Sequence, residues 1–181
     1  MTHGRLIAVV GPSGVGKDSI MSGIVAACPA IKLVRRTITR APNLGGEEYD
    51  AVTPEAFEQA VQSSQFCAHW GAHDLHYGIP YSVLEDVMNG TTCLANFSRG
   101  ALTQAATVFP AMTVLNITAR PEILAERLAE RGRETGAEIT KRLSQAAKPL
   151  PSGLNVVTVH NEGTLDDAVQ AALAALQPVR A

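Results

Sequence analysis

A glycine-rich segment near the N-terminus has the residue types needed to hold a polyphosphate. It reads Gly11-Pro12-Ser13-Gly14-Val15-Gly16-Lys17-Asp18-Ser19. Glycines let several backbone N–H groups converge on phosphate oxygens, because no Cβ atom stands in the way. Lys17 would add a positive charge for the β- and γ-phosphates, as the lysine of a phosphate-binding loop does. The segment therefore predicts a nucleotide-binding loop to which all of its residues contribute, with Lys17 as a catalytic candidate.

The elements around this segment support the prediction. Leu6–Val10 is a continuous apolar run, which is typical of a buried parallel strand. Residues 17–28 have apolar side chains at helical spacing, and Pro29 ends the pattern. The P-loop motif requires a strand before it and a helix after it, and the helix N-terminus adds its positive dipole end. The alternative is a glycine-rich turn with a solvated lysine, which would need neither the third glycine nor this context.

Asp18 departs from the usual motif, in which Ser or Thr follows the lysine and binds Mg²⁺. No carboxylate closes the expected strands at Phe97 or Thr118, the positions suited to a second Mg²⁺-positioning group. A carboxylate is a hard oxygen ligand that suits Mg²⁺. We therefore expect Asp18 to help position the metal, directly or through water. The alternative is that Asp18 only complements the dipole of the following helix.

The rest of the chain alternates between expected strands and helices. Further strands are expected at residues 31–34, 92–97, 113–118 and 155–159, and helices at 54–62, 82–88, 121–131, 137–147 and after Thr164. This order predicts an α/β fold with three layers, of the P-loop NTPase type, around a mostly parallel five-stranded sheet. The mixed stretch at about 36–90 is too long for a loop and is interpreted as an inserted acceptor-binding subdomain.

We expect one domain over residues 1–181, with its core at 1–35, 91–131 and 149–181 and a helical lid at about 132–148. The lid region is rich in arginine. Arg127, Arg131 and Arg133 are catalytic candidates, because lid arginines can stabilise charge on a transferring phosphoryl group. Glu126 and Glu130 lie between them, so a salt-bridged, solvated helix is the alternative.

A second group of side chains suits the binding of an acceptor that carries phosphate. Arginine forks match phosphate oxygens, and tyrosine hydroxyls can donate to them. The alternatives are solvated arginines and half-buried, packed tyrosines. The substrate-binding candidates are Arg36, Arg40, Tyr49, Tyr77, Ser98, Arg99 and Arg142.

The composition excludes several classes of protein. The chain is 46% hydrophobic and 18% charged, which is typical of a globular domain rather than a disordered one. A formal net charge of -2 gives no basic excess for nucleic acid or for a membrane surface. No apolar run approaches ~18 residues, and no signal peptide is evident. We expect a cytoplasmic protein with reduced thiols at its three cysteines. The oligomeric state stays open.

Taken with these residues, the chain resembles guanylate kinases over nearly its whole length. The resemblance rests on the loop at 11–19, on Thr37–Pro42, on Glu48-Tyr49, on Tyr77-Gly78, on the arginine-rich stretch 127–134 and on Asn161. It implies a kinase that uses ATP and Mg²⁺, with Asn161 in the nucleotide site.

Within that superfamily the chain is most similar to the ribose 1,5-bisphosphate phosphokinase family of phosphonate degradation. Gly-Lys-Asp-Ser at 16–19 is the most discriminating feature, and Leu75–Gly78 and Ser98-Arg99 agree with it. Guanylate kinases have a serine where this chain has Arg36, and they read guanine with a glutamate that is missing from residues 67–74. The resemblance implies ribose 1,5-bisphosphate as acceptor and 5-phospho-α-D-ribose 1-diphosphate as product.

Two other functions stay open at this point. One is a nucleoside monophosphate kinase that acts on GMP, although the glutamate that reads guanine is missing. The other is a catalytically inactive, guanylate kinase-like module that binds a protein partner. Intact Gly14, Gly16 and Lys17 argue against such a module.

Overall fold

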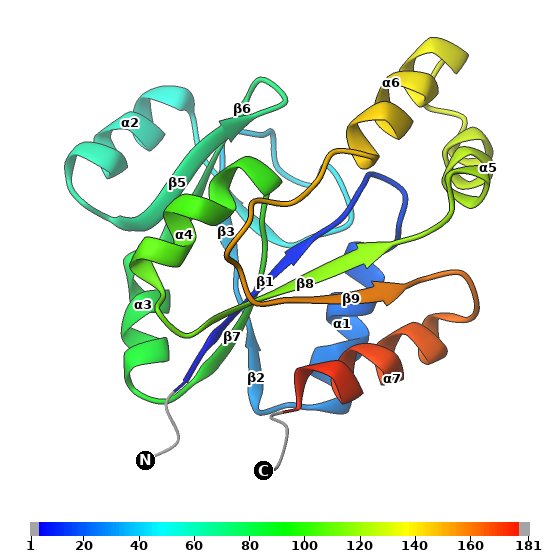
Figure 1. Cartoon of the computed structure of the whole chain (residues 1–181). Helices are drawn as coiled ribbons and strands as arrows, with labels where there is room; N and C mark the ends of the chain where they lie inside the picture. Colours follow the sequence, from blue (N-terminus) through cyan, green and yellow to red (C-terminus); the bar gives the residue numbers. More distant parts are fainter. Residues whose placement is uncertain (1–3, 178–181) are drawn as a thin grey trace.

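Five parallel strands form the centre of the computed structural model, which describes residues 4–177 (Figure 1). Their order across the sheet is β2-β7-β1-β8-β9, and every neighbouring pair is parallel. Parallel pairing with helical crossovers is the arrangement expected from the sequence, and it is confirmed. The strands are β1 (Leu6–Val10), β2 (Ile31–Leu33), β7 (Thr92–Asn96), β8 (Met112–Thr118) and β9 (Val156–His160).

Helices cover both faces of this sheet, which makes three layers (Figure 1). Helices α1 (Lys17–Ala27) and α7 (Leu165–Leu176) pack together on one face. The other face is covered by α3 (Tyr81–Met88) and α4 (Leu102–Val108), and a 3₁₀ turn at Arg99–Ala101 leads into α4. The sequence predicted α1, α3 and α7 but missed α4, which is short and carries Thr, Gln and alanines.

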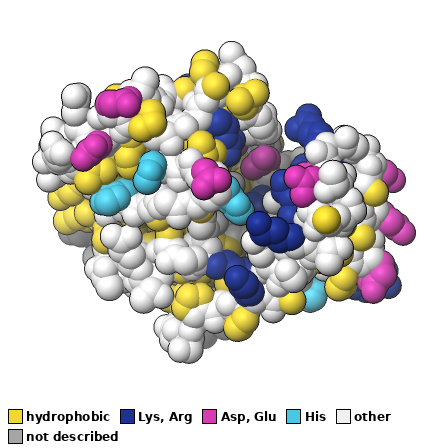
Figure 2. Space-filling view, turned by 90° about the horizontal axis from the view of Figure 1, so that it is seen from above, with side chains coloured by type: hydrophobic (Ala, Val, Ile, Leu, Met, Phe, Trp, Pro, Cys, Tyr) yellow, Lys and Arg dark blue, Asp and Glu magenta, His cyan; other side chains and the backbone are white. Residues whose placement is uncertain are grey.

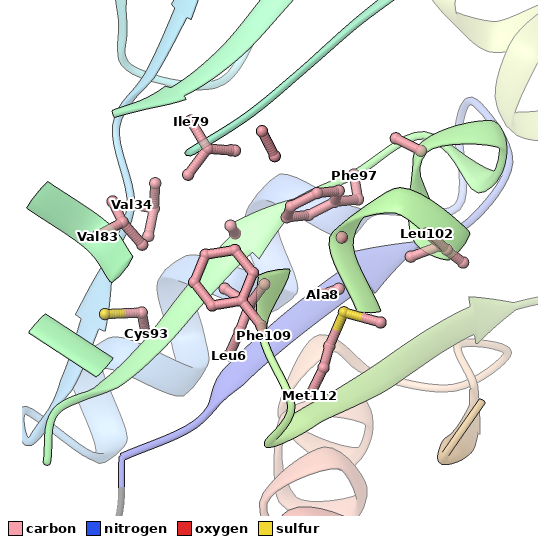
Figure 3. Packing of buried hydrophobic residues seen from close by; sticks show 14 of the residues in the cluster. Leu6, Ala8, Val34, Ile79, Val83, Cys93, Phe97, Leu102, Phe109 and Met112 are labelled. Carbon is pink, nitrogen blue, oxygen red and sulfur yellow. The ribbon is translucent and has the colours of Figure 1, made fainter. Parts of the chain in front are cut away.

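The central strand divides its side chains between the two cores. Leu6, Ala8 and Val10 belong to the core under α3 and α4, whereas Ile7 and Val9 belong to the core under α1 and α7. Figure 3 shows the first of these cores, with Leu6 among the side chains that gather there. All five β1 side chains are fully buried. This explains the uninterrupted apolar run, since a strand covered on both faces has no solvent side.

A second sheet stands over the carboxyl end of the first. It has four strands in the order β4-β3-β6-β5, and only β3 and β4 run parallel to each other. The strands are β3 (Arg36–Ile38), β4 (Tyr49–Ala51), β5 (Phe66–Ala72) and β6 (Leu75–Pro80). In the turn between β5 and β6, both residues have positive φ, as a two-residue type I′ hairpin requires.

The sequence predicted only two helices between residues 35 and 89, and both are confirmed. The first, α2 (Pro54–Gln62), is capped by the side chain of Thr53. The second is α3. The four strands were missed because β3 and β4 are three residues long and the alternation in β5 and β6 is broken by His and Gly.

Two further helices follow β8 and lie beyond its carboxyl end (Figure 1). Helix α5 (Pro121–Arg131) ends at Gly132, whose φ of 62° lets the chain turn. Helix α6 (Gly136–Ala146) begins with a capping box between Thr135 and Glu138. Both were predicted to within one residue. The division into core, insertion and lid stays a prediction, and residues 1–3 and 178–181 of the expected core lie outside the described residues.

Candidate active site

A cleft opens where the central strands β1 and β7 end. It encloses about 1990 Å³ between the phosphate loop, the four-stranded sheet and α6. The carboxyl ends of parallel strands are the usual place for a ligand in this class of fold. A pocket for one small molecule is typically ~300–1,000 Å³, so this cleft has room for two substrates together. Figure 2 shows Lys and Arg side chains gathered around the hollow.

The glycine-rich segment forms the floor of the cleft, between β1 and α1. Gly14 and Gly16 have φ values of 83° and 92°, which favour glycine. A Cβ atom on Gly16 would lie 2.8 Å from the Nδ2 of Asn161, so this position has no room for a side chain. Every residue from Gly11 to Ser19 lines the cleft except Val15, whose side chain is fully buried in the core. Val15 therefore anchors the loop, and only its backbone can face a phosphate.

Lys17 is held across the loop by two backbone carbonyls. Its Nζ donates to the oxygens of Gly11, at 2.8 Å, and Pro12, at 3.3 Å. Burial lowers the pKa of Lys17 from 10.5 to about 8, although the nearby carboxylate of Asp18 acts in the opposite direction. The ammonium group therefore lacks full charge compensation until an anion arrives.

Asn161 and Arg127 support the loop from behind. The Nδ2 of Asn161 donates to the carbonyl of Val15 at 2.8 Å, and Nη2 of Arg127 donates to the carbonyl of Asn161 at 2.9 Å. Both residues border a smaller hollow beside Gly14, Gly16 and Ser19 rather than the main cleft. Our prediction that Arg127 acts from the lid with Arg131 does not agree with this placement. Arg127 turns toward the strand end at Asn161, whereas Arg131 is the last residue of α5.

The lid arginines do line the main cleft. Arg131, Arg133 and Arg142 project toward it from the end of α5, the turn and α6. Arg142 pairs with Glu134 at 3.2 Å. Within residues 4–177, neither Arg131 nor Arg133 has a carboxylate partner at ion-pair distance, and Glu126 and Glu130 make no ion pair. The salt-bridged helix that the sequence left open is therefore absent from this part of the chain.

On the acceptor side, Arg36 is buried and already paired. Its Nε donates to Oε2 of Glu47 at 3.2 Å, its Nη2 donates to Oε1, and its guanidinium lies 4.8 Å from the centre of the Tyr77 ring. The sequence predicted Arg36 as a phosphate-binding residue and contained no sign of its partner Glu47. Tyr77 lines the cleft as expected, and its ring stacks on Trp70.

Arg99 and Ser98 also lie in the wall of the cleft, and both are engaged by neighbours. Arg99 donates to the carbonyls of Gln145, at 2.7 Å, and Ala146, at 3.1 Å. A cation at the C-terminus of α6 complements the helix dipole, and burial lowers the pKa of Arg99. The Oγ of Ser98 accepts from the indole N–H of Trp70 at 2.9 Å. Arg99 thus joins the acceptor side of the cleft to the lid.

Tyr49 does not line the cleft, in contrast to our expectation. Its ring is buried, and its hydroxyl donates to the carbonyl of Ala41 and accepts from the N–H of Leu44 at 3.2 Å. Arg40, which does line the cleft, lies over this ring at 5.2 Å. Tyr49 therefore shapes the loop that carries Arg40. Other residues of the wall were not among the predicted site residues, and they include Asn43, Leu44, His73 and Asn96.

The placement of Asp18 is compatible with binding a metal. Its side chain lines the cleft in the first turn of α1, and Oδ2 would be 3.0 Å from a Cβ atom on Gly46. No cluster of three or more His, Cys, Asp or Glu side chains suited to a metal occurs within residues 4–177. Mg²⁺ commonly uses only one or two carboxylates together with substrate phosphates, so a single carboxylate fits this ion.

A phosphate loop with its lysine at the end of a central parallel strand, facing an arginine-lined cleft, defines a P-loop phosphotransferase. The sequence model of the guanylate kinase family matches residues 3–178. The chain belongs to the guanylate kinase family. Within residues 4–177, no helix combines the length and apolar character needed to span a bilayer.

The chain is also similar to individual curated proteins and to solved structures. The chain is 49% identical to the ribose 1,5-bisphosphate phosphokinase PhnN of Ruegeria sp. (strain TM1040), over 98% of this chain and 94% of that protein. It is 40% identical to the protein of the same name from Agrobacterium fabrum, over 95% and 96% of the two chains. The guanylate kinase structure from Anaplasma phagocytophilum aligns with a TM-score of 0.66 and 17% identity, covering 97% of this chain and 86% of that one. That structural likeness shows the fold.

Proposed function

We propose that this protein transfers the γ-phosphoryl group of ATP to ribose 1,5-bisphosphate and forms 5-phospho-α-D-ribose 1-diphosphate, as part of phosphonate catabolism. Relatives named for this activity match it over almost its full length. The observation that carries the proposal is the charge of the cleft. Its lining combines two carboxylates, Asp18 and Glu47, with these cationic side chains: Lys17, Arg36, Arg40, Arg99, Arg131, Arg133, Arg142 and Lys148.

This charge suits an acceptor that carries two phosphates and no base. Each phosphate monoester holds about -1.5 to -2 charges at neutral pH, so ATP and the acceptor together bring a large negative charge into the cleft. A guanine base would instead need hydrogen-bond acceptors held at its edge, and its recognition fails when they are missing. Residues 67–74, where guanylate kinases carry the glutamate that reads guanine, contain no glutamate.

The reaction needs no general base. An oxygen of the acceptor's 1-phosphate, already ionised at neutral pH, attacks the γ-phosphorus, and the bond from that phosphorus to the β–γ bridging oxygen breaks. ADP leaves with the electron pair. Lys17 holds the β- and γ-phosphates, and Arg131 and Arg133 stabilise charge on the transferring group from the lid side.

Mg²⁺ would be held by Asp18 and the ATP phosphates, where it neutralises charge that develops between the β- and γ-phosphates. Asn161 and Arg127 act as positioning residues, because they fix the backbone of the phosphate loop through the Val15 carbonyl. On the acceptor side, Arg40, Tyr77, Ser98 and Arg142 border the space left for the bisphosphate. We place the reaction in the cytoplasm, where ATP is available.

An acceptor screen tests the proposal. The protein is incubated with ATP and Mg²⁺ and with ribose 1,5-bisphosphate, ribose 5-phosphate, GMP or AMP, and ADP release is measured. GMP would lose two hydrogen-bond partners at about 1–3 kcal/mol each, so we expect ribose 1,5-bisphosphate to exceed GMP by at least ~10²-fold in kcat/KM. Ribose 5-phosphate should be inert, because it lacks the 1-phosphate nucleophile.

The product is identified by ³¹P NMR, which should show a diphosphate on C1. The variant Lys17→Met is the control for contaminating kinases. It should keep the fold, and it lacks the positive charge that contacts the β- and γ-phosphates of ATP. A higher kcat/KM for GMP than for ribose 1,5-bisphosphate would contradict the proposed acceptor and leave only the general kinase assignment. A protein that releases no ADP with any acceptor would be a binding module instead.

A further inference from the structure

One carboxylate lies on the side of the cleft where the phosphates of the proposed acceptor would give it no binding partner. Of the two acidic side chains in the cleft wall, Asp18 belongs to the phosphate loop and has a role with Mg²⁺. Glu47 lies on the acceptor side, among arginines that face a bisphosphate. A carboxylate cannot donate to a phosphate, but it can accept a hydrogen bond from another part of the acceptor. Ribose 1,5-bisphosphate has two such parts, the hydroxyl groups on C2 and C3.

The side chain of Glu47 is held in a fixed position. Each of its oxygens accepts one hydrogen bond from Arg36, which is 4% exposed and is covered on one side by the ring of Tyr77. A carboxylate oxygen can accept two hydrogen bonds, so both oxygens keep acceptor capacity. The Glu47 side chain is 19% exposed, and Glu47 lines the cleft. The Nε and Nη2 groups of Arg36 already donate to Glu47. The pair therefore offers the cleft the free acceptor positions of the carboxylate.

A purely structural role explains the pair less well. Arg36 lies on β3 opposite Tyr49 of β4, at a buried position where an apolar side chain would avoid the cost of burying a charge. Arg36 and Glu47 together form a rigid, nearly neutral unit at the edge of the cleft. Such a unit gives direction to a hydrogen bond without adding positive charge.

The location of Glu47 indicates which hydroxyl it meets. Gly46, the residue before Glu47, lies against the phosphate loop, since a Cβ atom on Gly46 would be 3.0 Å from Oδ2 of Asp18. The chain at Glu47 therefore lies beside Asp18 and its neighbour Lys17. Lys17 marks the end of the cleft where the phosphoryl group is transferred, so the acceptor's C1 phosphate must be bound near it. C2 is bonded to C1, so its hydroxyl is the hydroxyl group nearest to the acceptor's C1 phosphate.

We infer that Glu47, held by Arg36, accepts a hydrogen bond from the C2 hydroxyl of the acceptor and makes the enzyme select ribose over 2-deoxyribose. This inference rests on the proposed function, because it assigns a determinant of specificity within the same site. A hydrogen bond to a charged acceptor is worth ~10- to 100-fold in affinity, and a neutral one a few-fold. Glu47 is therefore a specificity residue that touches substrate, and Arg36 is its positioning residue.

The test compares kcat/KM for ribose 1,5-bisphosphate and 2-deoxyribose 1,5-bisphosphate in four proteins. We expect a ratio of ~10–100 in the unmodified protein, a few-fold in Glu47→Gln, and about 1 in Glu47→Ala. Glu48→Gln is the matched control, because the Glu48 side chain is 90% exposed and pairs only loosely with Arg35, at 3.6 Å. It should keep the full ratio. Thermal melts show which variants are folded, and Glu47→Gln remains informative if Glu47→Ala is not.

Each outcome supports or overturns the inference. A ratio that falls from the unmodified protein to Glu47→Gln to Glu47→Ala supports it. Equal use of the two sugars by the unmodified protein overturns it, and so does a folded Glu47 variant that loses activity but keeps the ratio, since Glu47 would then only position Arg36. If the unmodified protein phosphorylates neither sugar, the proposed function fails as well, and the two failures are thereby distinguished.

Discussion

The lowered pKa of Lys17 gives ATP binding a pH dependence that can be calculated. Burial brings this pKa from 10.5 to about 8, and the polyphosphate of ATP favours the charged form. Above pH 8 the free protein is largely neutral at Lys17, so it must take up a proton to bind ATP. The fraction of charged Lys17 falls ~10-fold between pH 7 and pH 9, and the affinity for ATP should fall by the same factor.

Isothermal titration calorimetry with a non-hydrolysable ATP analogue measures both quantities. Titrations at pH 7, 8 and 9 give the affinity, and repeating them in two buffers of different ionisation enthalpy gives the protons taken up. We expect about half a proton per site at pH 8, since Lys17 is then half charged. The variant Lys17→Met should bind more weakly at pH 7 and show no such dependence. An affinity that is unchanged between pH 7 and 9, or proton uptake that persists in Lys17→Met, would refute the reasoning.

Three further predictions concern the metal, the lid and the loop support. Asp18→Asn keeps the shape of the side chain and removes its charge, so a higher Mg²⁺ concentration should be needed for half-maximal activity; an unaltered requirement would favour the role in the helix dipole. Arg131→Ala should lower kcat by ~10² with little change in ATP affinity, whereas Glu130→Ala, one position earlier, should leave kcat unchanged. Asn161→Ala leaves the buried carbonyl of Val15 without its donor and should reduce the free energy of unfolding by about 1–3 kcal/mol in urea denaturation; a stability equal to that of the unmodified protein would remove Asn161 from its supporting role.

The sequence predicted the parallel sheet well because its three central strands, β1, β7 and β8, are largely buried on both faces. Leu6–Val10 could be recognised from composition alone, and Pro121 and Thr164 marked the starts of two helices through the chemistry of their own side chains. The four-stranded sheet gave no comparable signal. Its three-residue strands are held by pairing with residues far away in sequence, as Arg36–Ile38 is with both β4 and β6. Local patterns do not report such pairing.

In the phosphate loop, backbone chemistry determines where the residues lie, so their positions could be predicted from the sequence. The prediction was less accurate for residues whose role depends on a side-chain partner. Nothing in the spacing of residues shows that Arg36 would find Glu47, that Tyr49 would turn its hydroxyl toward Ala41, or that Arg127 would face Asn161. Each of these contacts depends on how a loop or a strand end lies against another element, which the tertiary structure alone determines.

The four-stranded sheet has one more consequence, which concerns how such proteins can diversify. All of its strands come from one uninterrupted stretch, Arg36–Pro80, whereas the phosphate loop and the strand that carries it lie wholly upstream. Most of the acceptor side of the cleft can therefore be exchanged as one continuous segment with two junctions. The phosphate loop, which would bind ATP, is left unchanged. A chimaera that receives this stretch from a relative of different acceptor preference inherits the ion pair and the aromatic stack together. Recombination can then move substrate choice between family members in one step.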